Sequence, residues 1–246
     1  MKKIFRLLVA IFFVASFFST SNLISIANAA RENDEAETYF EDARTAFYNA
    51  LIQQLILRDS PNDSRARSAS NEYFTEALQL IGNATIIDPS SADYAFLASQ
   101  IYRARGVGRY AEKSFATAEE IYREQLTTSP KSIGANLDLS IALFAGDARN
   151  SKNSAEYQKE SRLLADEVIK LCKKKRRDGI HLRAYAMACI VKDKIKEAQD
   201  TLDKAVKEDP TLESFNQDFN DSLKTDPSGR RFLLYYMTIR DRNENL

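Results

Sequence analysis

The chain has 246 residues, of which 44% are hydrophobic and 28% charged, a composition typical of a globular protein with a large core. It carries 35 basic and 35 acidic residues, so its charge gives no general attraction to nucleic acid or to an anionic membrane. Seven glycines and five prolines are few, which argues against an all-β protein rich in tight turns.

The N-terminus has the pattern of a secretory signal peptide. Lys2, Lys3 and Arg6 form a basic start, an apolar run follows at 7–18, and residues 27–29 are a small-x-small cleavage site, Ala-Asn-Ala. A membrane-spanning helix needs about 20 mostly apolar residues. Polar residues dilute the run after residue 18, so the pattern favours cleavage over an uncleaved anchor.

Removal of residues 1–29 leaves a single domain, 30–246, with 32 basic and 35 acidic residues and a net charge of −3. We therefore predict an exported protein, periplasmic or secreted, and the Met-Lys-Lys start favours a bacterial source. No nucleic-acid partner is expected. Membrane contact is expected only through the signal segment, if that segment stays uncleaved.

Apolar residues at helical spacing predict that the domain consists of helices paired as hairpins. Pro89, Pro130 and Pro210 each follow the second helix of a pair, where proline ends a helix. A final helix is expected to cap the open end of the stack. The predicted pairs and final helix are 36–57 with 66–86, 91–105 with 110–127, 132–145 with 154–176, 180–192 with 195–207, and 228–241. The stretches 58–65, 105–109 and 146–154 are polar and predict the turns within the first three pairs.

The fourth pair has the most regular spacing of small and large apolar residues. These residues are Leu182, Tyr185, Ala186 and Cys189, then Ala198, Leu202 and Ala205, followed by Pro210. The spacing resembles that of the tetratricopeptide repeat (TPR) family, and looser copies extend the resemblance over most of 36–210. The resemblance implies an all-α fold, an α-solenoid of antiparallel helical hairpins in a right-handed superhelix with a C-terminal capping helix.

The resemblance also implies which residues line the concave face, where TPR proteins usually hold peptides. The inward positions are Phe96, Gln100 and Arg103, then Leu137, Ile141 and Phe144, then Arg183, Met187 and Ile190. This set is more apolar than the basic and asparagine residues of TPRs that bind peptide carboxylates. Two interpretations stay open. The face is a groove for an apolar helix, peptide or small ligand, or its residues are core packed against a terminal helix.

The two cysteines, Cys172 and Cys189, lie on adjoining predicted helices, and an exported chain meets an oxidising compartment. Their expected offset along the helix axes is about 6 Å, near the limit of disulfide reach. A disulfide and a pair of buried thiols are both compatible with the sequence.

No catalytic signature is found. His181 is the sole histidine, so a multi-histidine metal site is excluded and no Ser–His–Asp arrangement is suggested. We expect no enzyme activity, cofactor or metal. The first hypothesis is a scaffold that mediates protein–protein interaction in the bacterial cell envelope. The alternative is a periplasmic module that binds a hydrophobic ligand or peptide in association with a transporter.

Overall fold

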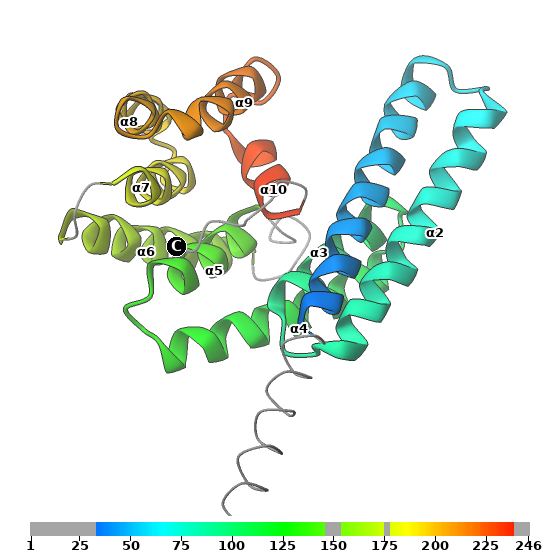
Figure 1. Cartoon of the computed structure of the whole chain (residues 1–246), viewed down its shortest axis with the longest axis horizontal. Helices are drawn as coiled ribbons and strands as arrows, with labels where there is room; N and C mark the ends of the chain where they lie inside the picture. The colour runs from blue at the N-terminus through cyan, green and yellow to red at the C-terminus, as the bar shows by residue number, and fades with distance from the viewer. Residues whose placement is uncertain (1–32, 146–153, 175–177, 239–246) are drawn as a thin grey trace, which may run out of the picture.

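A computed structural model of the chain describes residues 33–145, 154–174 and 178–238 (Figure 1). These residues form helices joined by turns, and no strand occurs among them. The predicted signal segment, nearly all of the predicted turn at 146–154 and residues 239–241 of the predicted final helix lie outside the described residues. None of the helices described is long and apolar enough to cross a membrane.

The described helices match the predicted ones, with ends that differ by a few residues. In chain order they are a first helix over 33–59, α2 (Ser64–Ile87), α3 (Ala92–Ala104), α4 (Gly108–Thr128), α5 (Ile133–Ala145), α6 (Ser154–Lys174), α7 (Gly179–Val191), α8 (Ile195–Glu208), η2 (Pro210–Leu212, a 3-10 turn), α9 (Glu213–Leu223) and α10 (Arg230–Thr238). Only α9 has no counterpart among the predicted helices.

Side-chain caps explain where two of these helices begin. The carboxylate of Asp63 accepts hydrogen bonds from the backbone N–H groups of Arg65 and Ala66 at 2.9 and 3.0 Å, which starts α2. Asp178 accepts from the N–H of His181 at 2.9 Å and starts α7 in the same way. These bonds satisfy N–H groups that have no partner within the helix itself.

Neighbouring helices pack in pairs, α3 with α4, α5 with α6 and α7 with α8, and successive pairs contact one another through α4–α5 and α6–α7. Fully buried alanines on the second helices, Ala118, Ala165 and Ala198, leave room for the facing helix. The chain is thus an all-α protein of packed helix pairs, an arrangement compatible with an α-helical repeat.

The first helices of the three pairs share their length, and two of the pairs share their turn. The first helices α3, α5 and α7 each have 13 residues. After α3 and α7 one residue has a positive φ, Gly106 at 77° and Asp193 at 61°. The N–H of the next residue, Val107 or Lys194, donates to the carbonyl five residues earlier at 2.9 Å. This is the bonding pattern of a helix that ends in a left-handed residue.

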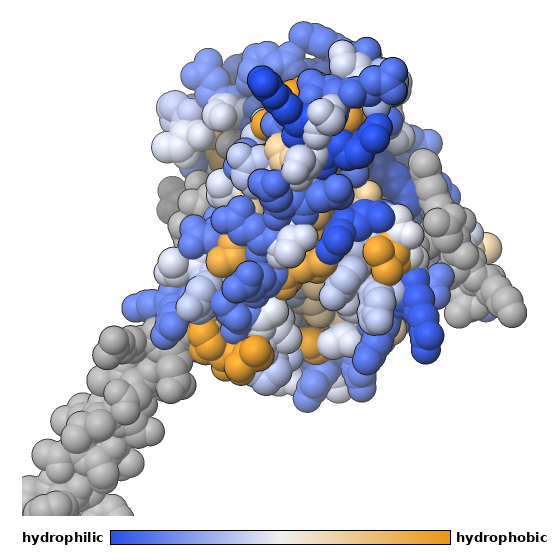
Figure 2. Space-filling model, turned by 90° about the vertical axis from the view of Figure 1, so that its right-hand side faces the viewer, coloured by the Kyte–Doolittle hydropathy of each residue, from blue (hydrophilic) through white to orange (hydrophobic). Residues whose placement is uncertain are grey.

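Helix α3 joins two hydrophobic clusters. On one side Leu97 and Ile101 pack with the first helix and α2. On the other, Phe96 belongs to a larger cluster that extends to α10. The first helix and α2 together project beyond the other helices (Figure 1). The outer face on which α2 lies is mainly hydrophilic, with hydrophobic residues in separate patches (Figure 2).

The C-terminal helix does not occupy the predicted end position. Its main contacts are with α5 and α3, and it also contacts α9 and α7. In Figure 1 it lies between the first helix on one side and α7 and α9 on the other. Helix α9 packs on α8, with hydrogen bonds from Asn216 to Asp203 at 2.9 Å and from Gln199 to Asn220 at 3.1 Å. The expected cap is therefore formed by α9, and α10 covers the first helices of the pairs.

At both equivalent turns the positive φ favours glycine, so introducing glycine at one turn and removing it at the other should change stability in opposite directions. Asp193→Gly is expected to stabilise the protein by about 0.5–1 kcal/mol, because glycine adopts positive φ without steric cost. Gly106→Ala is expected to destabilise it by about 1 kcal/mol, and by backbone strain alone, since a Cβ there meets nothing within 4 Å. Urea denaturation measures both. A loss of stability in Asp193→Gly would show that the aspartate side chain matters more than the backbone.

The position of α10 predicts a large cost for truncating its inward side chains. Leu233 is fully buried on α10, whereas Leu163 on α6 is 60% exposed. Leu233→Ala is expected to cost about 2–5 kcal/mol of unfolding free energy, and Leu163→Ala less than about 0.5 kcal/mol. Equal effects in chemical denaturation would contradict the packing of α10 described above.

Candidate functional site

The structure buries seven of the nine predicted concave-face residues. They lie on α3, α5 and α7, and those inside the largest hydrophobic cluster share it with Phe232, Leu233 and Tyr236 of α10. Seven of the nine are buried, namely Phe96, Gln100, Leu137, Ile141, Arg183, Met187 and Ile190. The structure thus has the arrangement of the second interpretation, a core packed against the C-terminal helix.

Aromatic and cationic contacts hold α10 on this face. The ring of Phe215 meets those of Phe232 and Tyr236 edge-on, with centroids 5.0 and 5.6 Å apart. The guanidinium of Arg183 lies over the Tyr236 ring at 5.6 Å, and that of Arg230 over the Phe144 ring at 5.7 Å. Such contacts are favourable in addition to the burial of apolar surface. A partner therefore has no access to the centre of the face formed by α3, α5 and α7 while α10 lies there.

The turn before α10 fixes where that helix begins. The carboxylate of Asp226 accepts hydrogen bonds from the Arg231 backbone N–H at 2.7 Å and from the Ser228 hydroxyl at 2.6 Å. Burial alone would raise the pKa of Asp226, but these hydrogen bonds outweigh it, and the pKa lies below its usual value. Gly229 has φ 67°, and a Cβ at this position would lie 2.7 Å from Cγ2 of Ile190. Only glycine fits this close approach without a shift of the Ile190 side chain.

The open candidate site is an apolar groove between the first helix, α3 and α10. It has a volume of about 420 Å³. Several of its side chains face solvent, with Tyr48 45%, Leu55 54% and Tyr235 36% exposed. The groove is lined by Phe47, Tyr48, Leu51, Ile52, Leu55, Gln100, Arg103, Ala104, Arg231, Leu234, Tyr235 and Thr238. Two of the predicted concave-face residues, Gln100 and Arg103, thus reach an accessible surface.

The charged residues that line the apolar groove are both arginines, Arg103 on α3 and Arg231 on α10. The remaining lining is apolar, aromatic or uncharged. At the end of α3 the carbonyl of Ala104 accepts a hydrogen bond from Gln54 Nε2 at 3.1 Å. The site therefore combines exposed hydrophobic surface with positive charge, and its backbone at this point is already paired.

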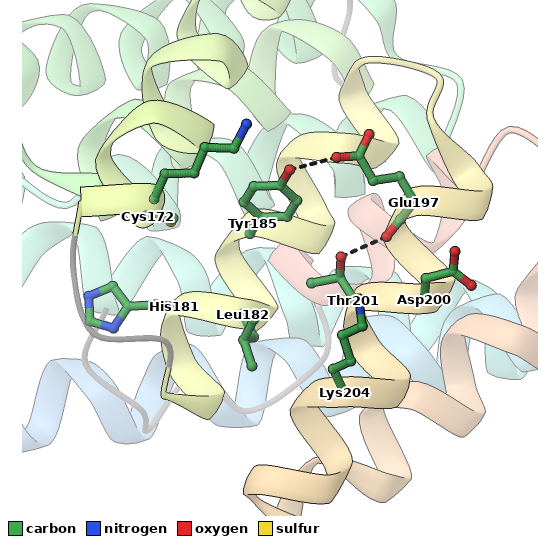
Figure 3. Close-up of a pocket in the computed structure, with 9 residues that line it drawn as sticks. Cys172, His181, Leu182, Tyr185, Glu197, Asp200, Thr201 and Lys204 are labelled. Carbon is green, nitrogen blue, oxygen red and sulfur yellow. Dashed lines mark hydrogen bonds between the residues drawn. The ribbon is translucent and has the colours of Figure 1, made fainter.

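A second, smaller pocket of about 200 Å³, here called the polar pocket, lies between α6, α7 and α8, and most of its lining residues carry polar or charged groups (Figure 3). Tyr185 donates a hydrogen bond from its hydroxyl to Glu197 at 2.6 Å, and Lys194 pairs with the same carboxylate at 3.2 Å. These two partners lower the pKa of Glu197, the tyrosine most. Lys173 lies over the Tyr185 ring at 5.9 Å. Lys173, Tyr185, Glu197 and Thr201 thus contact one another within this pocket.

His181 also lines the polar pocket. Its Nδ1 lies 2.6 Å from Oδ1 of Asp178, the carboxylate that caps α7. Residues three apart at a helix start commonly make such a contact, which needs no catalytic role. Among the described residues, no group of three His, Cys, Asp or Glu could hold a metal ion.

Cys172 and Cys189 are buried thiols in the structure. Burial, reinforced by the carboxylate of Glu197, raises the pKa of Cys189 to about 12. The structure thus has the two-thiol alternative, and the disulfide stays a hypothesis for experiment.

The apolar groove was not among the predicted sites, although the sequence holds a signal for it. In the first helix, Ala36, Phe40, Ala43, Phe47 and Ala50 form the stripe that packs in the smaller cluster. Tyr48, Leu51, Ile52 and Leu55 form a second stripe at i, i+3, i+4 and i+7. A helix with two apolar stripes has more apolar surface than one partner helix can cover.

Comparison with known proteins assigns no family. No protein-family model matches this chain, and no curated protein matches it either. The TPR resemblance therefore rests on residue spacing and stays a prediction.

Alkylation shows whether Cys172 and Cys189 are free thiols or form a disulfide. We expect the denatured, non-reduced protein to take up two alkyl groups, as two thiols require, with the reduced protein as control. In the folded protein at about pH 8, Cys189 should react very slowly, because its raised pKa leaves little thiolate. Mass spectrometry counts the groups. A non-reduced sample that takes up none would establish the disulfide instead.

Proposed function

We propose that the chain is an exported, non-catalytic helical-repeat scaffold that binds another protein through the apolar groove. The observation that carries this proposal is the solvent exposure of Tyr48, Leu55 and Tyr235 around a cavity whose walls come from three separate helices. Exposed apolar patches rimmed by polar residues mark interaction sites. We place the role in binding rather than catalysis because the sequence shows no catalytic signature, and Glu197 of the polar pocket is already bonded to Tyr185 and Lys194.

A protein partner fits the groove better than a small molecule because the apolar surface extends past the cavity. Ile56 does not line the cavity but is 40% exposed, and it continues the stripe of the first helix beyond Leu55. A small ligand would leave this extension in water. A protein segment would cover both the cavity and the extension.

The finer features of the proposal rest on the sequence and on the repeated turn. We propose a right-handed TPR-like solenoid, which the equal lengths of α3, α5 and α7 and the matching turns at Gly106 and Asp193 support. Export to the periplasm or the medium is proposed from the signal pattern at 1–29.

A hydrophobic small ligand is the second candidate, and the volume of the groove favours it. About 420 Å³ lies within the range of ligand pockets, roughly 300–1,000 Å³. In this case the protein would carry or sense an apolar compound beside a transporter.

Site-specific photo-crosslinking distinguishes these functions. A benzophenone amino acid replaces Leu55 in the groove or, as the matched control, Ile86, which is 81% exposed on α2. In the cells that make the protein, we expect irradiation to attach another protein at Leu55 and not at Ile86. A mass increase the size of a small molecule would favour the second candidate. The same adducts at both positions would contradict a binding role for the groove.

A further inference from the structure

We infer that the occupant of the apolar groove is an amphipathic α-helix of a partner protein that carries acidic side chains beside its apolar face. This inference rests on the proposed function, the use of the groove as a protein-binding surface, and it names the class of partner. It is carried by the shape of the groove, by the state of its backbone groups and by its charge.

The shape of the groove matches a helix. Along the first helix the accessible apolar residues Tyr48, Leu51, Ile52, Leu55 and Ile56 recur at helical spacing. They span eight residue steps, or about 12 Å, which is slightly more than two helical turns. Side chains in such rows form ridges, and the ridges of a second helix pack into the grooves between them. The opposite wall is also a helix, α10, which contributes Leu234 and Tyr235.

The backbone of the groove favours a helix over an extended peptide. An extended peptide binds well where a sheet edge offers unpaired N–H and C=O groups. The walls here are helices, whose interior backbone groups are bonded within the helix. At the end of α3, where a carbonyl could be available, Ala104 accepts from Gln54 Nε2. A partner that enters must therefore bring its own backbone hydrogen bonds, and an α-helix does so.

The charge of the groove favours acidic residues on that helix. Arg103 and Arg231 are its charged lining residues, in a mature chain that is net acidic. The carboxylate of Asp226, at the start of α10, accepts hydrogen bonds from Ser228 and from the Arg231 backbone and also interacts with the Arg231 charge. Arg231 itself is exposed at the groove. Complementary charge increases the association rate and selects among apolar helices.

The test uses a defined peptide, because no partner is identified. A peptide of about 18 residues, stapled to stay helical, carries leucines at i, i+3, i+4 and i+7 and glutamates on both flanks. Its control has lysine at each glutamate position. Fluorescence anisotropy with the mature chain, 30–246, is expected to show the glutamate peptide binding at least about tenfold more tightly than the lysine peptide. Added salt is expected to reduce the difference in affinity between the two peptides.

Variants locate the binding. Leu55→Asp is expected to weaken the glutamate peptide at least about tenfold, whereas Ile86→Asp, at an exposed apolar site outside the groove, leaves its affinity unchanged. Arg231→Glu is expected to shift the preference toward the lysine peptide by several-fold. Arg231 and Leu55 are exposed, so circular dichroism is expected to show that both variants stay folded.

Other outcomes overturn the inference and are distinguishable from a failure of the proposed function. If both peptides bind equally, the groove is used but its occupant is not an acidic helix. The same conclusion follows if neither peptide binds but laurate does, and Leu55→Asp abolishes the binding of laurate. Concentration-dependent dimerisation that Leu55→Asp removes would make a second copy the occupant. If the glutamate peptide binds Leu55→Asp normally, the groove itself is not the binding surface, and the proposed function fails as well.

Discussion

Four side chains of α10, Phe232, Leu233, Tyr236 and Met237, bury themselves against the face that α3, α5 and α7 form. Complete burial of a large apolar side chain contributes roughly 1.5–3 kcal/mol, so these four side chains stabilise the position of α10 substantially. This face is covered by a segment of the chain itself, α10. The apolar groove lies at its margin, between the first helix, α3 and α10.

The same helix forms one wall of the apolar groove. While its inner side packs on α5 and α3, its outer residues Arg231, Leu234 and Tyr235 face the first helix. The groove consequently combines residues near position 50 with residues near position 235, which are remote in sequence. Packing in the core and access at the groove are coupled, because a shift of α10 would change both.

Local sequence signals predicted the helices but not which helices remote in the sequence pack together. Helical periodicity and the prolines at 89, 130 and 210 act over a few residues, so the predicted ends lie close to the observed ones. Helix α9 was not predicted, because Pro210 was interpreted only as the end of the preceding helix. Phe215 and Phe219 nevertheless lie four residues apart, which is the spacing of one helix face. The apolar character of the concave set was also predicted, but an amphipathic helix shows only that a face must be buried. It does not show which surface covers that face, so packing against a terminal helix was one of two open interpretations, and the groove was not predicted.

The position of α10 also determines how the protein unfolds. In an array whose pairs touch only their neighbours, the terminal units fray first and independently of the rest. Here one short helix touches α3, α5 and α7 at once. Opening the array at any of these helices breaks contacts with the same element, so local fluctuations at separate units become linked. An architecture that is modular in its sequence thereby gains the cooperativity of a closed globular domain.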